Sequence, residues 1–146
     1  MNIGSGNNYP SNALSNFAPH AFIIDGVKCA SMEGFLQAFK TKSPEMQEHI
    51  CGLVGRAAKS AGKNKNWTKT QTLYWQGVEY PRKSEEYQLL LSRAYDALYT
   101  SNGFKRALKA SGNATFTHSI GKRKQDETVL TIKEFVTNLN RLRDKL

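Results

Sequence analysis

The stretch SMEGFLQAFK, residues 31–40, has the pattern of a capped helix with one apolar face. Ser31 is of a residue type that often caps the N-terminus of a helix. Apolar side chains then recur at helical spacing. They are Met32, Phe35, Leu36 and Phe39. We expect a helix that begins near Ser31 and packs this face into a core.

The polar edge of the same helix carries Glu33, Gln37 and Lys40 at positions i, i+4 and i+7. At 100° per residue these side chains lie within about 60° of one another on the helix wheel. A carboxylate and an amine beside an apolar wall can have shifted pKa values, as acid–base or Schiff-base chemistry requires. Spacing alone favours an ordinary solvated edge, so both interpretations stay open.

The rest of the chain predicts an α+β fold: one mostly helical domain over residues 1–146 with a small β-sheet or hairpin. Residues 1–16 have the composition of a loop, and 21–25 and 27–30 that of a hairpin. Further helices are expected at 44–63 (in two pieces), 84–98, 104–110 and 131–142, and strands at 72–78 and 114–117.

The composition is that of a globular protein, with 39% hydrophobic residues in a chain of 146. No apolar run approaches the ~20 residues of a membrane span, and the N-terminus lacks the pattern of a signal peptide. We therefore expect no membrane partner and a cytoplasmic location, in a bacterium or in the host of a virus. The spacing of the two cysteines and three histidines predicts neither a metal site nor a disulfide framework.

The formal charge of +9 is unevenly placed. Residues 50–78 contain no acidic side chain but several basic ones. They are Arg56, Lys59, Lys63, Lys65 and Lys69. Such a stretch suits nucleic acid, a smaller phosphorylated ligand or simply a solvated surface. None of the common nucleic-acid-binding signatures is present.

Three features of the chain could bind a ligand. Gly62–Lys63 could serve a phosphate, although a helix end capped by Gly62 is the favoured interpretation. Trp67 and Trp75 lie in the basic stretch and could stack on a base, although core packing is the more common role. Residues 118–131 bring Gly121, Glu127 and Thr128 before the last helix, where they could hold an anion or a sugar; an ordinary helix start is the alternative.

Taken together and in order, the motifs resemble those of the NADAR family over about residues 8–143. That family has S-N-F before S-[VT]-E-x-x-x-Q-A-x-K. The matching segments are LSNF (14–17), SMEGFLQAFK (31–40), Gly62–Lys63 with Trp67, YWQG (74–77), RKSEEY (82–87, with one inserted Glu) and HSIG…ETVLT within 118–131. The resemblance implies a YbiA-like fold and N-glycosidase activity, with no cofactor and no obligate protein partner.

Two activities are associated with the family. One branch removes ADP-ribose from guanine in DNA and so reverses a toxin's modification. The other, similar to YbiA, cleaves the N-glycosidic bond of phosphorylated riboflavin-pathway intermediates. The W-G-x-G…G-x-N-x-L-G segment of the second branch is absent here, which with the positive charge favours ADP-ribosylated, single-stranded DNA as the partner. A non-catalytic module that binds ADP-ribose or nucleic acid, or a plain DNA-binding protein, remains the alternative class.

The resemblance also implies roles for particular residues. Glu33 matches the essential glutamate, Lys40 the reactive lysine, and Trp67 a functionally important tryptophan. Asn16 and Phe17 match the S-N-F loop at the ligand. The remaining expected contacts to substrate are Gln37, Lys63, Trp75, Gly121, Glu127 and Thr128.

Overall fold

Helix α2 (Met32–Ala38) is packed on several sides in the computed structural model, which describes residues 1–146. Ser31 caps it as expected, its Oγ accepting a hydrogen bond from the Gly34 N–H at 3.2 Å. A Cβ on Gly34 would lie 2.7 Å from the Ile50 carbonyl oxygen. Only glycine therefore allows the neighbouring helix to approach the backbone of α2 this closely.

The first half of the chain contains α2 and the elements that pack directly on it. An antiparallel hairpin precedes it, with Phe22 opposite Cys29, and short helices follow it. The elements are α1 (Ser11–Leu14), β1 (Phe22–Ile24), β2 (Val27–Cys29), α3 (Pro44–Cys51), α4 (Gly55–Ala61) and α5 (Trp67–Thr70).

The second half adds another antiparallel hairpin and the longer helices. The last helix begins with a complete capping box between Thr131 and Glu134. The elements are β3 (Thr72–Trp75), β4 (Val78–Pro81), α6 (Glu85–Leu98), α7 (Asn102–Ala110), a 3-10 turn (Gln125–Glu127) and α8 (Ile132–Arg143).

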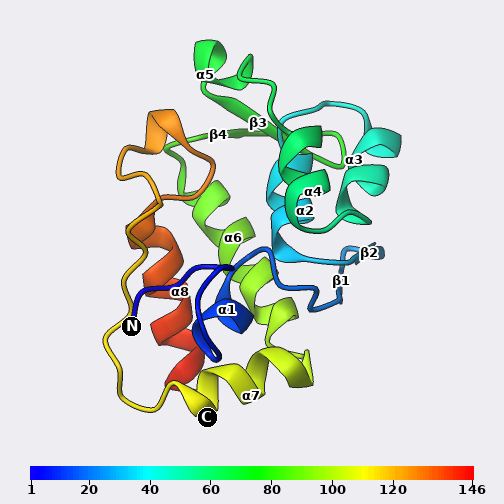
Figure 1. Ribbon diagram of the computed structural model, residues 1–146. Helices are drawn as coiled ribbons and strands as arrows, with labels where there is room; N and C mark the ends of the chain where they lie inside the picture. The colour runs from blue at the N-terminus through cyan, green and yellow to red at the C-terminus, as the bar shows by residue number, and fades with distance from the viewer.

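Figure 1 shows α6, α7 and α8 gathered in one part of the molecule and α2, α3 and α4 in another. One cluster of 30 buried hydrophobic residues joins the two groups. Within it, Phe39 of the α2 C-cap packs edge-to-face on Tyr87 of α6, with ring centroids 5.7 Å apart. No helix combines the length and apolar character that a membrane crossing requires.

The α+β class is confirmed, and so are the first hairpin, the break in residues 44–63 and the three later helices. The strand predicted at 114–117 is wrong: this segment makes only an isolated bridge, between Thr117 and Asn2. The strand predicted at 72–78 ends at Trp75, where Gln76 and Gly77 turn with positive φ into a second strand. The first sixteen residues also contain the short α1.

Candidate functional site

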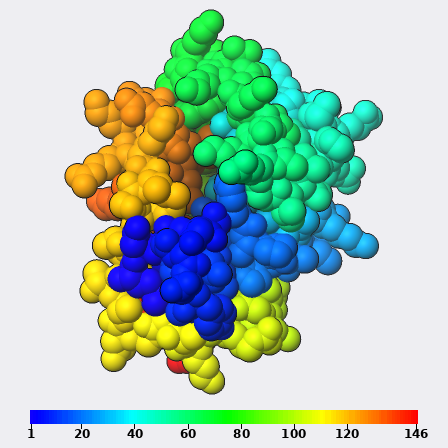
Figure 2. All heavy atoms as spheres, in the orientation of Figure 1, coloured from blue at the N-terminus to red at the C-terminus, as the bar shows by residue number.

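A cavity of about 530 Å³ lies where four segments far apart in the chain meet. Its lining comes from residues 5–17, 33–40, 59–68 and 118–135. Figure 2 shows a hollow between the orange segment before α8 and the green segment around α4. The N-terminal segment, in blue, forms its lower border in this view.

Glu33 and Gln37 of α2, together with Lys40 just beyond the C-terminal end of this helix, line the floor of this cavity. Gln37 Nε2 donates a hydrogen bond of 2.8 Å to Glu33 Oε1. Lys40 Nζ donates one of 2.7 Å to the Gly62 carbonyl oxygen. The three side chains that the helical spacing placed on one edge are thus held side by side, and the edge is not a solvated surface.

The carboxyl group of Glu33 has a raised pKa, because burial penalises its charged form. The hydrogen bond from Gln37 and the positive charges of Lys40, Lys59 and His118 oppose this shift without cancelling it. Glu33 can therefore exchange a proton with a ligand at a pH where an exposed glutamate would be fully ionised.

The amino group of Lys40 has a lowered pKa, again because burial penalises the charge. Glu33 opposes the shift, and the neighbouring charges of Lys65, Lys122 and Lys59 reinforce it. A lysine in this environment offers more free amine near neutral pH than an exposed one, which a nucleophile needs.

The S-N-F loop is fixed on the start of α2. The Asn16 carbonyl oxygen accepts the Glu33 backbone N–H at 3.0 Å. The Asn16 side-chain oxygen accepts the hydroxyl of the fully buried Tyr95 at 2.8 Å. Asn16 and Phe17 both line the cavity, so this loop forms a wall whose position depends on α6 as well as α2.

Gly62 ends α4, as the favoured interpretation held, and it also touches the floor of the cavity. A Cβ at this position would lie 2.0 Å from Gln37 Oε1. That oxygen is buried and has no hydrogen-bond partner in the chain. A side chain at Gly62 would therefore displace Gln37, and with it the partner of Glu33.

The cavity is rich in positive charge, with five lysines and only two glutamates, Glu33 and Glu127, in its lining. The sequence patterns identified two of these lysines, Lys40 and Lys63, as candidate site residues. Lys59 and Lys65 were noted only as part of the acid-free stretch 50–78. Lys122 belongs to the short basic run that follows Gly121. Such a lining suits an anionic ligand. The lysines are Lys40, Lys59, Lys63, Lys65 and Lys122.

The wall before α8 is anchored by a buried arginine. Arg82 has no exposed surface and donates from Nε to the Thr128 carbonyl oxygen at 2.8 Å. Its other nitrogens donate to both carboxylate oxygens of Glu134, at 3.0 and 2.6 Å. Burial opposes ionisation of Glu134, but the bonds from Arg82 and from the Thr131 backbone hold its pKa below the usual value. Glu127 and Thr128, both lining the cavity, therefore belong to a fixed segment.

All the predicted site residues line the cavity except Trp75. Trp67 lines it with 4% of its surface exposed. The structure places Trp75 outside this cavity: its ring packs edge-to-face on Phe35, with ring centroids 4.8 Å apart, and its Nε1–H donates to Asp25. Trp75 belongs to the core, the alternative that its residue type favoured.

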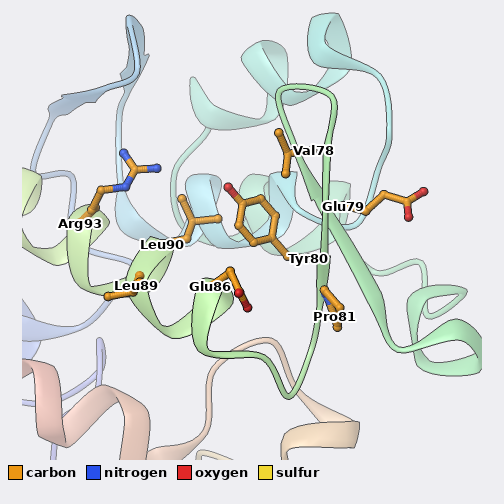
Figure 3. Close-up of a pocket in the computed structure, with 8 residues that line it drawn as sticks. All are labelled: Val78, Glu79, Tyr80, Pro81, Glu86, Leu89, Leu90 and Arg93. Atoms are coloured by element: carbon orange, nitrogen blue, oxygen red, sulfur yellow. The ribbon is translucent and has the colours of Figure 1, made fainter.

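A second cavity of similar volume, about 530 Å³, lies between β4 and α6 (Figure 3). It contains none of the predicted site residues. Its one basic side chain, Arg93, is paired with Asp25 at 2.8 Å, and the lining also includes Glu79 and Glu86. This lining does not suit an anion. Nowhere do three or more His, Cys, Asp or Glu side chains gather as a metal would need.

Comparison with known proteins agrees with the resemblance in the motifs. Residues 8–144 match the family "Bacteriophage protein GP30.3". The "uncharacterized 17.1 kDa protein in Gp30-rIII intergenic region" of Enterobacteria phage T4 is 42% identical over 151 residues, covering 100% of this chain and 98% of that protein. The NMR structure of E. coli YbiA superposes with a TM-score of 0.62 at 16% identity, over 99% of this chain and 83% of YbiA. The chain therefore belongs to the bacteriophage GP30.3 family and has a fold similar to that of E. coli YbiA.

Proposed function

We propose that the protein is an N-glycosidase that removes ADP-ribose from ADP-ribosylated guanine in single-stranded DNA. One observation carries the proposal: Glu33, with a raised pKa, and Lys40, with a lowered pKa, meet at the floor of a lysine-lined cavity. A carboxyl group and a free amine are what glycosidic cleavage through a covalent intermediate needs.

Glu33 stabilises the transition state in this mechanism. As the bond between the ribose C1 and the base nitrogen breaks, positive charge develops on the sugar, and a nearby carboxylate lowers its energy. Gln37 holds that carboxylate through the bond at 2.8 Å. Glu33 also moves protons at the ribose hydroxyls, for which a raised pKa is an advantage.

Once the base has left, water adds to the positively charged C1 and loses a proton, and the resulting hemiacetal opens to the aldehyde on which Lys40 acts. The amine adds to C1 and loses water to give an imine, and a water molecule then hydrolyses the imine and releases ADP-ribose. The lysines of the cavity bind the two phosphates during both steps. Lys63 and Lys65 are exposed residues of the cavity lining and lie close in the chain to Trp67. Their positive charges are suited to hold the DNA strand at the cavity.

The test uses a single-stranded oligonucleotide carrying one ADP-ribosyl-guanine, with products identified by mass spectrometry. We expect the wild type to remove the mass of ADP-ribose and Glu33→Gln to lose this activity. Glu86→Gln is the matched control, because that carboxylate lines the second cavity, and it should remain fully active.

Absence of any mass loss with the wild type would contradict the proposal. Turnover of a phosphorylated riboflavin intermediate instead would assign the protein to the other glycosidase activity. If neither substrate is cleaved but ADP-ribose raises the melting temperature, the chain is a binding module. Binding of unmodified DNA alone, with no response to ADP-ribose, would identify a plain DNA-binding protein.

A further inference from the structure

A base that leaves a sugar takes the electron pair of the broken bond onto its nitrogen and so needs a proton. In the mechanism above Glu33 serves the sugar and Lys40 the open aldehyde, so neither supplies this proton. His118 also lines the cavity and is unused by the mechanism, and an imidazolium group is a common proton donor in catalysis.

The His118 ring is held rigidly at the cavity wall. Its Nδ1 lies 2.8 Å from the Ile3 carbonyl oxygen. The ring packs edge-to-face on Phe135 of α8, with centroids 5.0 Å apart. On another side Gly121 comes so close that a Cβ there would lie 2.7 Å from His118 Cδ2. A ring fixed on three sides keeps its free nitrogen in one direction, as a catalytic proton donor requires.

The hydrogen bond to Ile3 also sets the tautomer. A carbonyl oxygen only accepts, so Nδ1 carries a hydrogen in both charge states. The other ring nitrogen, Nε2, makes no hydrogen bond within the chain. In the imidazolium form, Nε2–H is a donor available to a ligand in the cavity.

The charged groups around the ring are few. From α2 the carboxylate of Glu33 acts on it, and His118 is among the positive groups that oppose the raised pKa of Glu33. Lys122 follows on its own segment and lines the same cavity. The contacts from α8 and from the N-terminal segment are Phe135 and the Ile3 carbonyl, which are uncharged.

We propose, on the basis of the function above, that His118 is the general acid that protonates the departing guanine. As the C1–N bond breaks, its electron pair goes to the base nitrogen, which takes the proton from His118 Nε2. The sugar is left as the oxocarbenium ion that Glu33 stabilises. The proton that water loses when it adds to C1 of this ion returns to the imidazole, so each turnover consumes one water molecule and balances without any other reactant.

The decisive variant is His118→Asn. Its side-chain amide places an N–H near the former Nδ1 and keeps the bond to Ile3, but it has nothing at the position of Nε2. We expect cleavage of the ADP-ribosyl-guanine oligonucleotide to slow by about 100-fold. The affinity for free ADP-ribose should be unchanged, because the proton is needed only when the bond breaks. ADP-ribose linked to 4-nitrophenol, whose leaving group needs no proton, should be cleaved by the variant as by the wild type.

His20→Gln is the matched control. Its ring also bonds a carbonyl oxygen, that of Ala13, through Nε2 at 2.7 Å, and it packs edge-to-face on Phe104 outside the cavity. Glutamine preserves that bond, and activity should remain at the wild-type level.

Full guanine cleavage by His118→Asn would overturn the general-acid role. An equal loss on both substrates, or a loss of cleavage together with ADP-ribose affinity, would also overturn it, because a structural or binding role predicts those results. A wild type that cleaves neither substrate would instead refute the proposed function itself. The wild-type assay alone therefore separates failure of that function from failure of the His118 role.

Discussion

At the scale of single residues, burial is the main cause of the shifted pKa values of Glu33 and Lys40. The spacing of Glu33, Gln37 and Lys40 predicted that their side chains lie on one side, and all three line the same cavity, although Lys40 follows the end of α2. It could not predict that the edge is buried, because the covering wall comes from residues 118–135. The opposite pKa shifts of Glu33 and Lys40 follow from that burial.

Substitution Gly62→Ala tests how tightly the floor of the cavity is packed. The added Cβ would lie 2.0 Å from Gln37 Oε1, so Gln37 must move away from Glu33. We expect a loss of stability of about 1–3 kcal/mol, typical of overpacking, together with loss of glycosidase activity. Thermal unfolding and the oligonucleotide assay measure the two effects. Gly6→Ala is the control, since nothing lies within 4 Å of that Cβ; equal behaviour of the two variants would contradict the prediction.

The lowered pKa of Lys40 predicts where along the pH scale it reacts. Free ADP-ribose and cyanoborohydride should attach the sugar to Lys40, and the rate should reach its plateau well below the ordinary lysine pKa of 10.5. In Glu33→Gln the plateau should move to still lower pH, because Glu33 raises the pKa of Lys40. Peptide mapping by mass spectrometry locates the adduct. An adduct rate at Lys40 that follows the pH dependence of the exposed Lys109 would argue against this environment.

At the scale of elements, the wall of the site and the last helix form one unit around Arg82. This residue joins the end of β4 to the Thr128 carbonyl and to Glu134 in the capping box of α8. The capping box itself was predicted from the spacing of Thr131 and Glu134. The partner Arg82, 52 residues away in the chain from Glu134, left no local signal.

Removal of Arg82 should therefore be costly. Arg82→Met leaves the Glu134 carboxylate buried without its partner, and we expect a loss of about 3–5 kcal/mol in urea unfolding at neutral pH. Arg93→Met, which breaks the half-exposed pair with Asp25, should cost about 0–1 kcal/mol.

The same pair predicts a dependence on acid. The folded-state pKa of Glu134 is lowered, so its contribution to stability is present above the ordinary value of 4.5 and is lost as the pH falls through the lowered value. The difference in stability between the wild type and Arg82→Met should therefore shrink below about pH 4.5. If the difference in unfolding free energy between the wild type and Arg82→Met stays constant at low pH, the Arg82–Glu134 pair is not the cause of the stability loss.

Two strand predictions failed for different reasons: one strand pair has an uncommon turn, and the other segment has its partner at the far end of the chain. β4 was missed because its turn is Gln76–Gly77, which is not among the common hairpin pairs such as Asn-Gly. The strand expected at 114–117 has suitable residues, but its one partner, Asn2, lies at the other end of the chain and supplies a single bridge. Local patterns predict helices with an apolar face well, and they say little about which strands find a partner.

At the scale of the whole molecule, the net charge of +9 is not spread evenly, because five of the lysines line one cavity. The composition alone could not distinguish this from an evenly basic surface. It also could not separate Trp67, which lines the cavity, from Trp75, which packs in the core, because both stand in the same basic stretch.

The concentration of charge predicts how binding responds to salt. Affinity for a single-stranded oligonucleotide should fall as salt rises, and Lys65→Ala and Lys122→Ala should each reduce the slope of log affinity against log salt by about 0.7. Lys109→Ala is the control, since this residue lies on α7 away from the cavity. Fluorescence anisotropy at several salt concentrations gives the slopes. Equal slopes for all three variants would place the DNA elsewhere.

The four segments that line the cavity span residues 5–135, so the pocket exists only when nearly the entire chain is in place. No partly folded fragment offers the same lining. Occupancy by a ligand must then favour the folded chain over the unfolded one, by about 2.7 kcal/mol at a ligand concentration of 100 times Kd. A molecule that holds a ligand in this cavity should therefore resist proteolysis better than an empty one, and its lifetime should follow the supply of that ligand.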